Sequence, residues 1–242
     1  MKKLVCPILG IVMFALSACI KSGDNIQTLK EVPAVVGLSF DPFSTTIIIS
    51  NGAGGAWQFI APELNEFLDI DLNEGDLLIT NFTINYEQQP FPPYTTVSNL
   101  TWKKVDLGYP KHKSEAEDDF DVFFENATLW DVIQYNWKDL LFFKFVQKAP
   151  ADQEFVYEMT YDYNDFGMCT VYIRAKENGT GSQPSAKNSF YYAFDVSDLV
   201  GNLSPSNNNV RFNIVFKTGE KDGEEIYQSW VGNPLVLPLR DE

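Results

Sequence analysis

The stretch Leu78-Ile79-Thr80-Asn81-Phe82-Thr83-Ile84-Asn85-Tyr86 alternates apolar and polar residues for most of its length. Successive side chains of a strand point to opposite faces of its sheet, so a period of two separates an apolar face from a polar one. The apolar face holds Leu78, Phe82, Ile84 and Tyr86, and the polar face holds Asn81, Thr83 and Asn85. A strand with one polar face is typical of an antiparallel sheet or a barrel. The stretch therefore predicts an all-β fold.

Short strands are expected on both sides of this stretch. β-branched and aromatic runs occupy residues 35–40, 45–50, 57–61 and 95–106, with turn residues between them. Residues 62–68 leave room for one or two helical turns. Five strands around one short helix suit a small closed barrel of the OB-like kind. We assign this OB-like β-barrel domain to residues 34–107.

The second half of the chain has the pattern of a sandwich. Strands are expected near residues 140–146, 155–163, 168–174, 190–194, 212–216 and 226–231. Short strands at this spacing predict an Ig-like antiparallel β-sandwich over residues 120–242. The turn-forming Gly108-Tyr109-Pro110 and the charged run that follows it predict a linker over residues 108–119.

The N-terminus has the features of an export signal. Lys2 and Lys3 precede an apolar run, and small residues Ser17 and Ala18 come directly before Cys19. This ending resembles the lipobox of bacterial lipoproteins, in which the chain is cut before a lipidated cysteine. We therefore expect a signal-peptide helix in residues 1–18, lipid on Cys19 and a tether over residues 19–33. A plain secretory signal and a buried helix are the alternatives, since the apolar segment is shorter than the roughly 20 residues that span a bilayer.

Three stretches together resemble the NigD-like lipoprotein family of Bacteroidota. They are the lipobox, Glu74-Gly75-Asp76-Leu77-Leu78-Ile79 entering a strand, and Tyr192-Ala193-Phe194-Asp195-Val196-Ser197-Asp198-Leu199 at the end of another. The resemblance implies an OB-like domain followed by a β-sandwich, and a link to bacteriocin production or immunity. It brings no catalytic residues. The segment after Cys19 has Asp24 as its only acidic residue before Glu31, so cell-surface display and a periplasmic face both remain open.

The charge balance excludes some partners. The chain has 18 Lys and Arg residues against 33 Asp and Glu residues, and loss of Lys2 and Lys3 takes its net charge from −15 to −17. Such a chain is repelled by nucleic acid and by anionic lipid. The expected barrel has Lys103 and Lys104 as its only basic residues, so single-stranded nucleic acid finds no basic groove there. We expect no nucleic-acid partner.

The chain has too few cysteine and histidine residues for a catalytic thiol or for a zinc or iron site. Of three cysteines, Cys6 leaves with the signal and Cys19 takes lipid, so Cys169 stays as a buried apolar side chain. A catalytic thiol needs a histidine, and the only one is His112 in a polar stretch. One histidine and one cysteine are too few ligands for a zinc or iron site. The stretch Asp69-Ile70-Asp71-Leu72-Asn73 has oxygen-bearing side chains at alternate positions, as the start of a calcium-binding loop does, but the sequence after it does not continue that pattern. We expect no enzyme activity, catalytic residue, metal or cofactor, and leave a calcium ion open.

Aromatic residues are the remaining signal for binding, at 14% of the chain with five tryptophans. Most should fill the cores, and Trp230 and Trp57 are the candidates for ligand contacts. The expectation is a non-enzymatic protein, anchored by lipid on Cys19 to the cell envelope, with the outer membrane favoured. It should bind a protein or another extracytoplasmic ligand through sandwich loops or an interdomain groove. A carbohydrate-binding lipoprotein of a glycan-uptake system is the alternative.

Overall fold

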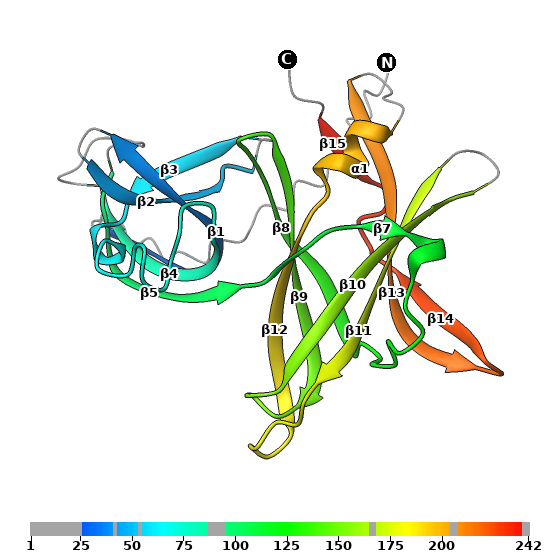
Figure 1. Cartoon of the computed structure of the whole chain (residues 1–242). Helices are drawn as coiled ribbons and strands as arrows, with labels where there is room; N and C mark the ends of the chain where they lie inside the picture. Colours follow the sequence, from blue (N-terminus) through cyan, green and yellow to red (C-terminus); the bar gives the residue numbers. More distant parts are fainter. Residues whose placement is uncertain are drawn as a thin grey trace, which may run out of the picture.

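The computed structural model describes residues 26–40, 43–52, 55–86, 95–164, 168–203 and 208–238. The predicted signal peptide and Cys19 lie outside these residues. The described chain is built almost entirely of strands arranged in three sheets, with one short α-helix (Figure 1). The expected all-β class is therefore confirmed. No helix among the described residues is both long and apolar enough to cross a membrane.

The first sheet has the strand order β3-β2-β1-β4-β5. Its elements are β1 (Ile26–Phe40), β2 (Phe43–Ser50), β3 (Ala56–Ile60), β4 (Leu77–Asn85) and β5 (Val97–Val105), with the 3-10 turn η1 (Pro62–Leu64) after β3. Leu64 and Leu72 cover its concave side and pack against Phe59 and Phe82 in one apolar cluster. The alternation around Phe82 is thus explained by this core.

The expected closed barrel is not present. Among the described residues, the two edges of the first sheet meet at a single parallel bridge between Ile60 and Thr96, with a hydrogen bond of 2.9 Å from Ile60 N to Thr95 O. β3 ends at Ile60, and Ala61 and Pro62 lead at once into η1, so the pairing toward β5 does not extend beyond this bridge. The first sheet is a strongly curved open sheet.

The sandwich consists of two sheets. One has the order β6-β12-β9-β8 and the other β14-β13-β11-β10-β7, with β15 also paired to β13. Their strands are β6 (Leu107–Gly108), β7 (Lys111–His112), β8 (Asn126–Tyr135), β9 (Lys138–Ala149), β10 (Glu154–Tyr163), β11 (Cys169–Asn178), β12 (Ala186–Asp195), β13 (Asn209–Lys221), β14 (Glu224–Ser229) and β15 (Leu235–Pro238). The 3-10 turn η2 (Lys113–Glu115) follows β7, and α1 (Ser197–Asn202) follows β12.

These sheets are mixed, which corrects the expectation of an antiparallel, Ig-like sandwich. β11 and β13 pair in parallel because the chain crosses to the other sheet as β12 and returns through α1 before β13 begins. β6 and β7 also pair in parallel, with β12 and β10 respectively. A parallel pair needs such a crossover, whereas hairpins alone give antiparallel neighbours.

Two segments predicted as unstructured contain paired strands. β1 begins at Ile26, inside the expected tether, and pairs with β4 from there on. The expected linker over residues 108–119 contributes the end of β6, all of β7 and η2, so it runs along both sheets of the sandwich. The division of the chain into domains stays a prediction.

A third apolar cluster joins the first sheet to the sandwich. Val35, Ile48 and Leu77 of the first sheet pack against Leu140 and Phe142 of β9. The opposite faces of the same strands form the two other clusters, of which the larger lies between the sandwich sheets. The molecule therefore has three stacked β layers (Figure 1). A filled apolar contact occupies the place where we expected an interdomain groove.

The last of the three stretches that carried the family resemblance, residues 192–199, has a local structural role. Asp195 ends β12, and its Oδ1 accepts hydrogen bonds from the backbone N and the Oγ of Ser197 at 3.1 and 2.5 Å. Ser197 Oγ also accepts a hydrogen bond of 2.8 Å from Asp139 N. This arrangement fixes the start of α1 against β9.

Candidate functional site

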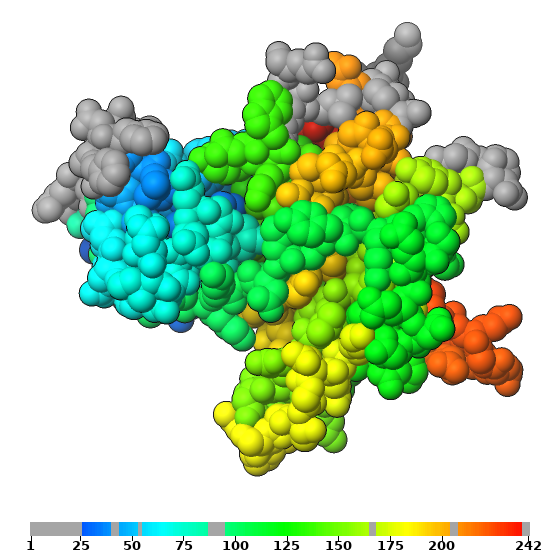
Figure 2. All heavy atoms as spheres, in the orientation of Figure 1, coloured from blue at the N-terminus to red at the C-terminus, as the bar shows by residue number. Residues whose placement is uncertain are grey.

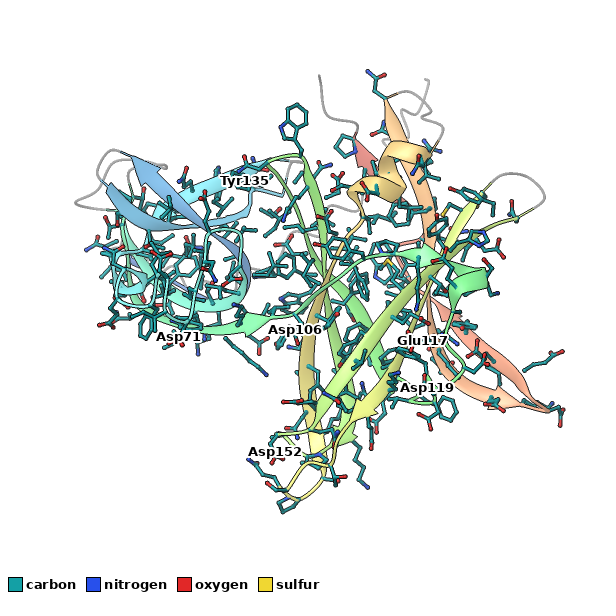
Figure 3. All side chains as sticks on the ribbon, in the orientation of Figure 1. Asp71, Asp106, Glu117, Asp119, Tyr135 and Asp152 are labelled. Carbon is teal, nitrogen blue, oxygen red and sulfur yellow. The ribbon has the colours of Figure 1, made fainter. Side chains whose placement is uncertain are left out.

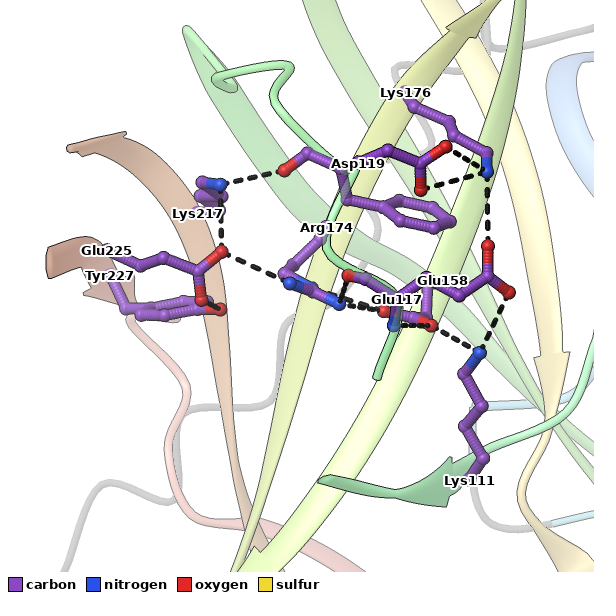
Figure 4. A network of polar contacts seen from close by, with 10 residues as sticks. Lys111, Glu117, Asp119, Glu158, Arg174, Lys176, Lys217, Glu225 and Tyr227 are labelled. Carbon is purple, nitrogen blue, oxygen red and sulfur yellow. Dashed lines mark hydrogen bonds and ion pairs between the residues drawn. The ribbon is translucent and has the colours of Figure 1, made fainter. Parts of the chain in front are cut away.

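A charged network covers the outer face of β10, β11 and β13 (Figure 4). Residues 111–125, which we call the strap, cross this face, and Figure 3 places Glu117 and Asp119 of the strap beside β10 and β11. Arg174 bonds Glu158, Glu225 and the backbone oxygen of Glu117. Lys176 bonds Asp119 at 2.9 Å and Glu117 at 3.1 Å. The network therefore fastens the strap to the sheet.

The buried charges of this network are all partnered. Arg174 and Glu158 have side chains only 7% and 4% exposed. Lys217, equally buried, bonds Phe120 O at 2.7 Å and Glu225 at 2.8 Å. Burial alone would raise the pKa of Glu225, but hydrogen bonds from Lys217, Tyr227 and Arg174 outweigh it and lower that pKa to about 2. Such complete pairing indicates a structural role.

A second polar cluster joins the first sheet to the sandwich at two bulges. Trp130 lies in a bulge of β8 and donates from Nε1 to the backbone oxygen of Glu31, in a bulge of β1, at 2.8 Å. Lys144 bonds Glu31 at 2.7 Å and lies 4.6 Å from the Trp130 ring centroid. Burial raises the pKa of neighbouring Asp131 to about 6, against hydrogen bonds from Val132 N and Ser50. These contacts position the two parts of the molecule.

A hollow of about 630 Å³ opens where β9 leads into β10, at the end of the sandwich. We call it the end hollow. Its lining comes from the strap, β9, β10 and β11, and comprises Asp119, Asp121, Val122, Phe123, Glu125, Gln147, Lys148, Ala149, Phe155, Lys176 and Glu177. Phe123 is 46% exposed, so an aromatic ring faces solvent beside several carboxylates. Aromatic and charged groups are thus combined in one concave surface.

Gln147 lines the end hollow, and its side-chain nitrogen forms no hydrogen bond with any described residue. Its side chain points between the sandwich sheets and is 4% exposed. Gln147 Nε2 and the hydroxyl of Tyr157 are both buried, and neither has a hydrogen-bond partner among the described residues. Burial raises the pKa of Tyr157, and the Gln147 amide lies near enough to oppose that rise without completing a bond. A buried amide in this state costs about 1–3 kcal/mol.

The two tryptophans expected to contact a ligand occupy different surfaces. Trp57 lies on the edge strand β3 and is 48% exposed. Trp230 packs against the sandwich core and lines a small hollow of about 90 Å³ between β8 and β14. The structure does not bring them together in one site. Their role in binding stays a prediction.

A third tryptophan, at the β8–β9 turn, is far more exposed. Trp137 is 72% exposed, and both turn residues have positive φ, 47° for Asn136 and 65° for Trp137. Tyr135 pairs with Lys138 around them, so the loop has two residues and the geometry of a type I′ turn. Figure 2 shows this tip as a green protrusion above the sheets. Sequence reasoning expected Trp137 in a core. Asn136 and Lys138 on either side were the available signal for a turn.

The residues expected to be inert lie as follows. Cys169 is buried and free, and burial raises its pKa to about 12, so its thiol stays protonated at neutral pH. His112 lies at the surface of β7, where Nδ1 contacts Ser114 at 2.8 Å. Within the described ranges, no group of three His, Cys, Asp or Glu side chains is arranged to hold a metal ion.

Known proteins share the fold of this chain at low sequence identity. No family model matches the sequence, and no curated protein matches it. A NigD-like immunity protein from Bacteroides caccae superposes with a TM-score of 0.55 at 12% identity, covering 87% of this chain and 97% of that one. A protein of unknown function, DUF1344, from Bacteroides vulgatus superposes with a TM-score of 0.50 at 13% identity, covering 86% and 94%. The resemblance to NigD-like proteins is therefore confirmed at the level of the fold.

Proposed function

We propose that this chain is a non-enzymatic, lipid-anchored protein of the bacterial cell envelope that binds a partner protein through its β8–β9 turn. The observation that carries the proposal is Trp137, an indole 72% exposed on a turn with positive φ. A bulky residue in the left-handed region is strained, and such strain persists where surrounding structure supports it, above all at functional sites.

Trp137 has the properties of an anchor for a protein surface. Tryptophan is among the residues that contribute most at protein interfaces, usually by filling a pocket of the partner. The indole stands at the apex of a two-residue turn between paired strands, so little conformational freedom is left to lose on binding. Lipid bilayers are less suitable partners, since a chain whose net charge is −17 after loss of Lys2 and Lys3 is repelled by anionic headgroups.

The fold neighbours support a role in immunity. One of them is named as a NigD-like immunity protein. For this chain we infer a toxin of the bacteriocin kind as the partner class. Held outside the cytosol by lipid on Cys19, it would meet such a toxin at the envelope.

Photo-crosslinking tests the binding proposal. A benzophenone amino acid is placed at position 137 of the full chain in cells of its host, and at Tyr109, which is 64% exposed, as a matched control. We expect one discrete protein adduct from position 137 and none of that size from position 109. Excess unlabelled protein should abolish the adduct, and excess Trp137→Gly protein should not. Equal competition by both proteins would contradict the proposal.

Anchoring has its own test. Six residues separate Cys19 from β1, which limits the reach of the chain to about 25 Å from the lipid. Radiolabelled palmitate should enter the full chain, and Cys19→Ala should abolish the label and leave the precursor uncut. Labelling that survives this substitution would show that another residue is modified.

Carbohydrate binding is the second candidate, favoured by the half-exposed Trp57 on an edge strand. Aromatic faces stack on the apolar faces of sugar rings. Affinity electrophoresis against a panel of polysaccharides separates the two candidates. Retardation that is lost in Trp57→Ala and kept in Trp137→Gly would favour the glycan.

A further inference from the structure

We propose that the end hollow is a second binding site, for a peptide segment that carries lysine or arginine next to an aliphatic residue. This site goes beyond the proposed function, because it shares no residue with the β8–β9 turn. Its lining combines carboxylates, a half-exposed phenylalanine and a buried amide with an unused hydrogen bond.

The charges of the end hollow favour a cation. Asp119, Asp121, Glu125 and Glu177 line it together with Lys148 and Lys176, which leaves a net charge of −2. Lys176 is already bound to Glu117 and Asp119 of the strap. Asp121 and Glu177 form no ion pair with any described residue, and Glu125 approaches exposed Lys187 only at 4.0 Å. A lysine or arginine of the ligand therefore meets carboxylates whose charge is still available.

The amide of Gln147 favours a ligand with a hydrogen-bond acceptor. A half-turn about the last torsion of Gln147 exchanges its nitrogen and oxygen. Tyr157 then donates its hydroxyl proton to Oε1, and Nε2 turns toward the hollow that this side chain lines. A backbone carbonyl of the peptide accepts from Nε2 in that position. Gln147 Nε2 is then satisfied by the peptide, and the Tyr157 hydroxyl is satisfied by Gln147 Oε1.

Phe123 and Phe155 supply the apolar wall. Phe123 is 46% exposed, whereas buried Phe124 beside it belongs to the sandwich core. The methylene stem of a lysine or arginine packs on an aromatic ring while its charged end reaches a carboxylate. An aliphatic neighbour in the peptide covers the remaining ring surface. Nucleic acid is repelled by the carboxylates that line the same hollow.

Calorimetric titration of the full chain in detergent tests this site. The probe is the peptide acetyl-Lys-Leu-Arg-Leu-Lys-amide, with acetyl-Glu-Leu-Glu-Leu-Glu-amide and the disaccharide maltose as comparison ligands. We expect saturable binding of the basic peptide alone, weakened several-fold between low and high salt because exposed charges are screened.

Two variants separate the contributions. Gln147→Leu removes the unpaired amide without shrinking the core, and should weaken the peptide at least tenfold with folding stability kept or raised. Asp121→Asn with Glu125→Gln changes exposed residues and should remove most of the salt dependence. Glu66→Gln with Glu74→Gln, at exposed positions between β3 and β4, is the charge-matched control and should bind like wild type.

Several results would overturn this inference. They are no saturable binding of the basic peptide, affinity unchanged by Gln147→Leu, or an equal loss in the charge-matched control. Binding of maltose in place of the peptide would also overturn it, and would make the end hollow a sugar site. None of these outcomes touches the crosslinking from position 137, so the two proposals fail separately.

Discussion

The β8–β9 and β13–β14 hairpins use the same backbone turn with different residues. Asn136 and Trp137 have φ of 47° and 65°, and Asp222 and Gly223 have φ of 55° and 82°. Both loops have two residues, between the strand pairs 135–138 and 221–224. Asp-Gly is a favoured sequence for a type I′ turn, because glycine adopts positive φ without strain. The β13–β14 hairpin follows this preference and the β8–β9 hairpin does not.

The two hairpins also differ in how they are attached to the rest of the molecule. Both tips project from the molecule (Figure 2). β14 is tied to the sheet by Glu225, which binds Lys217 and Arg174. The tip of β8–β9 instead presents an exposed indole. The comparison teaches that one hairpin is optimised for folding, whereas the other gives up stability for an exposed side chain, as a binding element does.

The largest expected effect comes from breaking the attachment of the β13–β14 hairpin and the strap. Arg174→Met should lower the free energy of unfolding by about 3 kcal/mol, because among the described residues it leaves buried Glu158 with Lys111 as its one ion-pair partner. Urea unfolding followed by tryptophan fluorescence measures this loss. Arg211→Met, which alters an exposed arginine of β13, should change it by less than about 0.5 kcal/mol. Equal effects of the two variants would show that the network does not stabilise the fold.

Acid should loosen the same attachment. The pKa of Glu225 is about 2 in the folded chain and 4.5 for the free group. A lowered pKa means that its stabilisation is present above pH 4.5 and is lost as the pH falls toward 2. Allowing for partial exposure, the loss is about 2 kcal/mol. Urea unfolding between pH 6 and pH 2 should show this dependence, and Glu225→Gln should reduce it. Glu224→Gln, at the exposed start of β14, should leave the pH dependence as in wild type.

The fold could be predicted from the sequence where one face of a strand is polar. The alternation of apolar Phe82 and Ile84 with polar Asn81 and Thr83 predicted β4 correctly. The apolar side of this strand faces a core, as expected. The stacking of the first sheet on the sandwich was missed, although Ile47-Ile48-Ile49 contains its signal. A continuous apolar run indicates a strand buried on both faces. Barrel closure and parallel pairing depend on contacts between distant segments, which local patterns do not specify.

The candidate sites were harder to predict. Trp57 was named as a candidate for ligand contacts and is half-exposed, whereas Trp137 was assigned to a core because its type is usually buried. The end hollow joins the strap to residues of β9 and β11, far apart in sequence. Gln147 has no distinguishing neighbour in the sequence, and its unpaired amide is apparent only when the strands are packed together.

A smaller effect follows from giving the β13–β14 turn the residue of the other hairpin. Gly223→Trp should lower the free energy of unfolding by about 1 kcal/mol, since an L-residue is strained at positive φ. Apart from its two chain neighbours, no atom lies within 4 Å of a Cβ at this position, so the Cβ itself meets no steric overlap. Urea unfolding measures the change. The new tryptophan should not produce a crosslinked protein adduct at this hairpin. A gain in stability would contradict the account of both turns.

The smallest effect is the reciprocal change, and it separates strain from contact. Trp137→Gly should raise the free energy of unfolding by about 0.5 kcal/mol, because relief of strain exceeds the extra entropy of glycine in the unfolded chain. Trp137→Ala removes the same indole but keeps a Cβ at φ of 65°, so it should be less stable than Trp137→Gly. Urea unfolding of the three proteins under one condition gives the order. If Trp137→Ala and Trp137→Gly had equal free energies of unfolding, both lower than that of wild type, Trp137 would be held by packing of its indole. Its exposure would then no longer imply a partner.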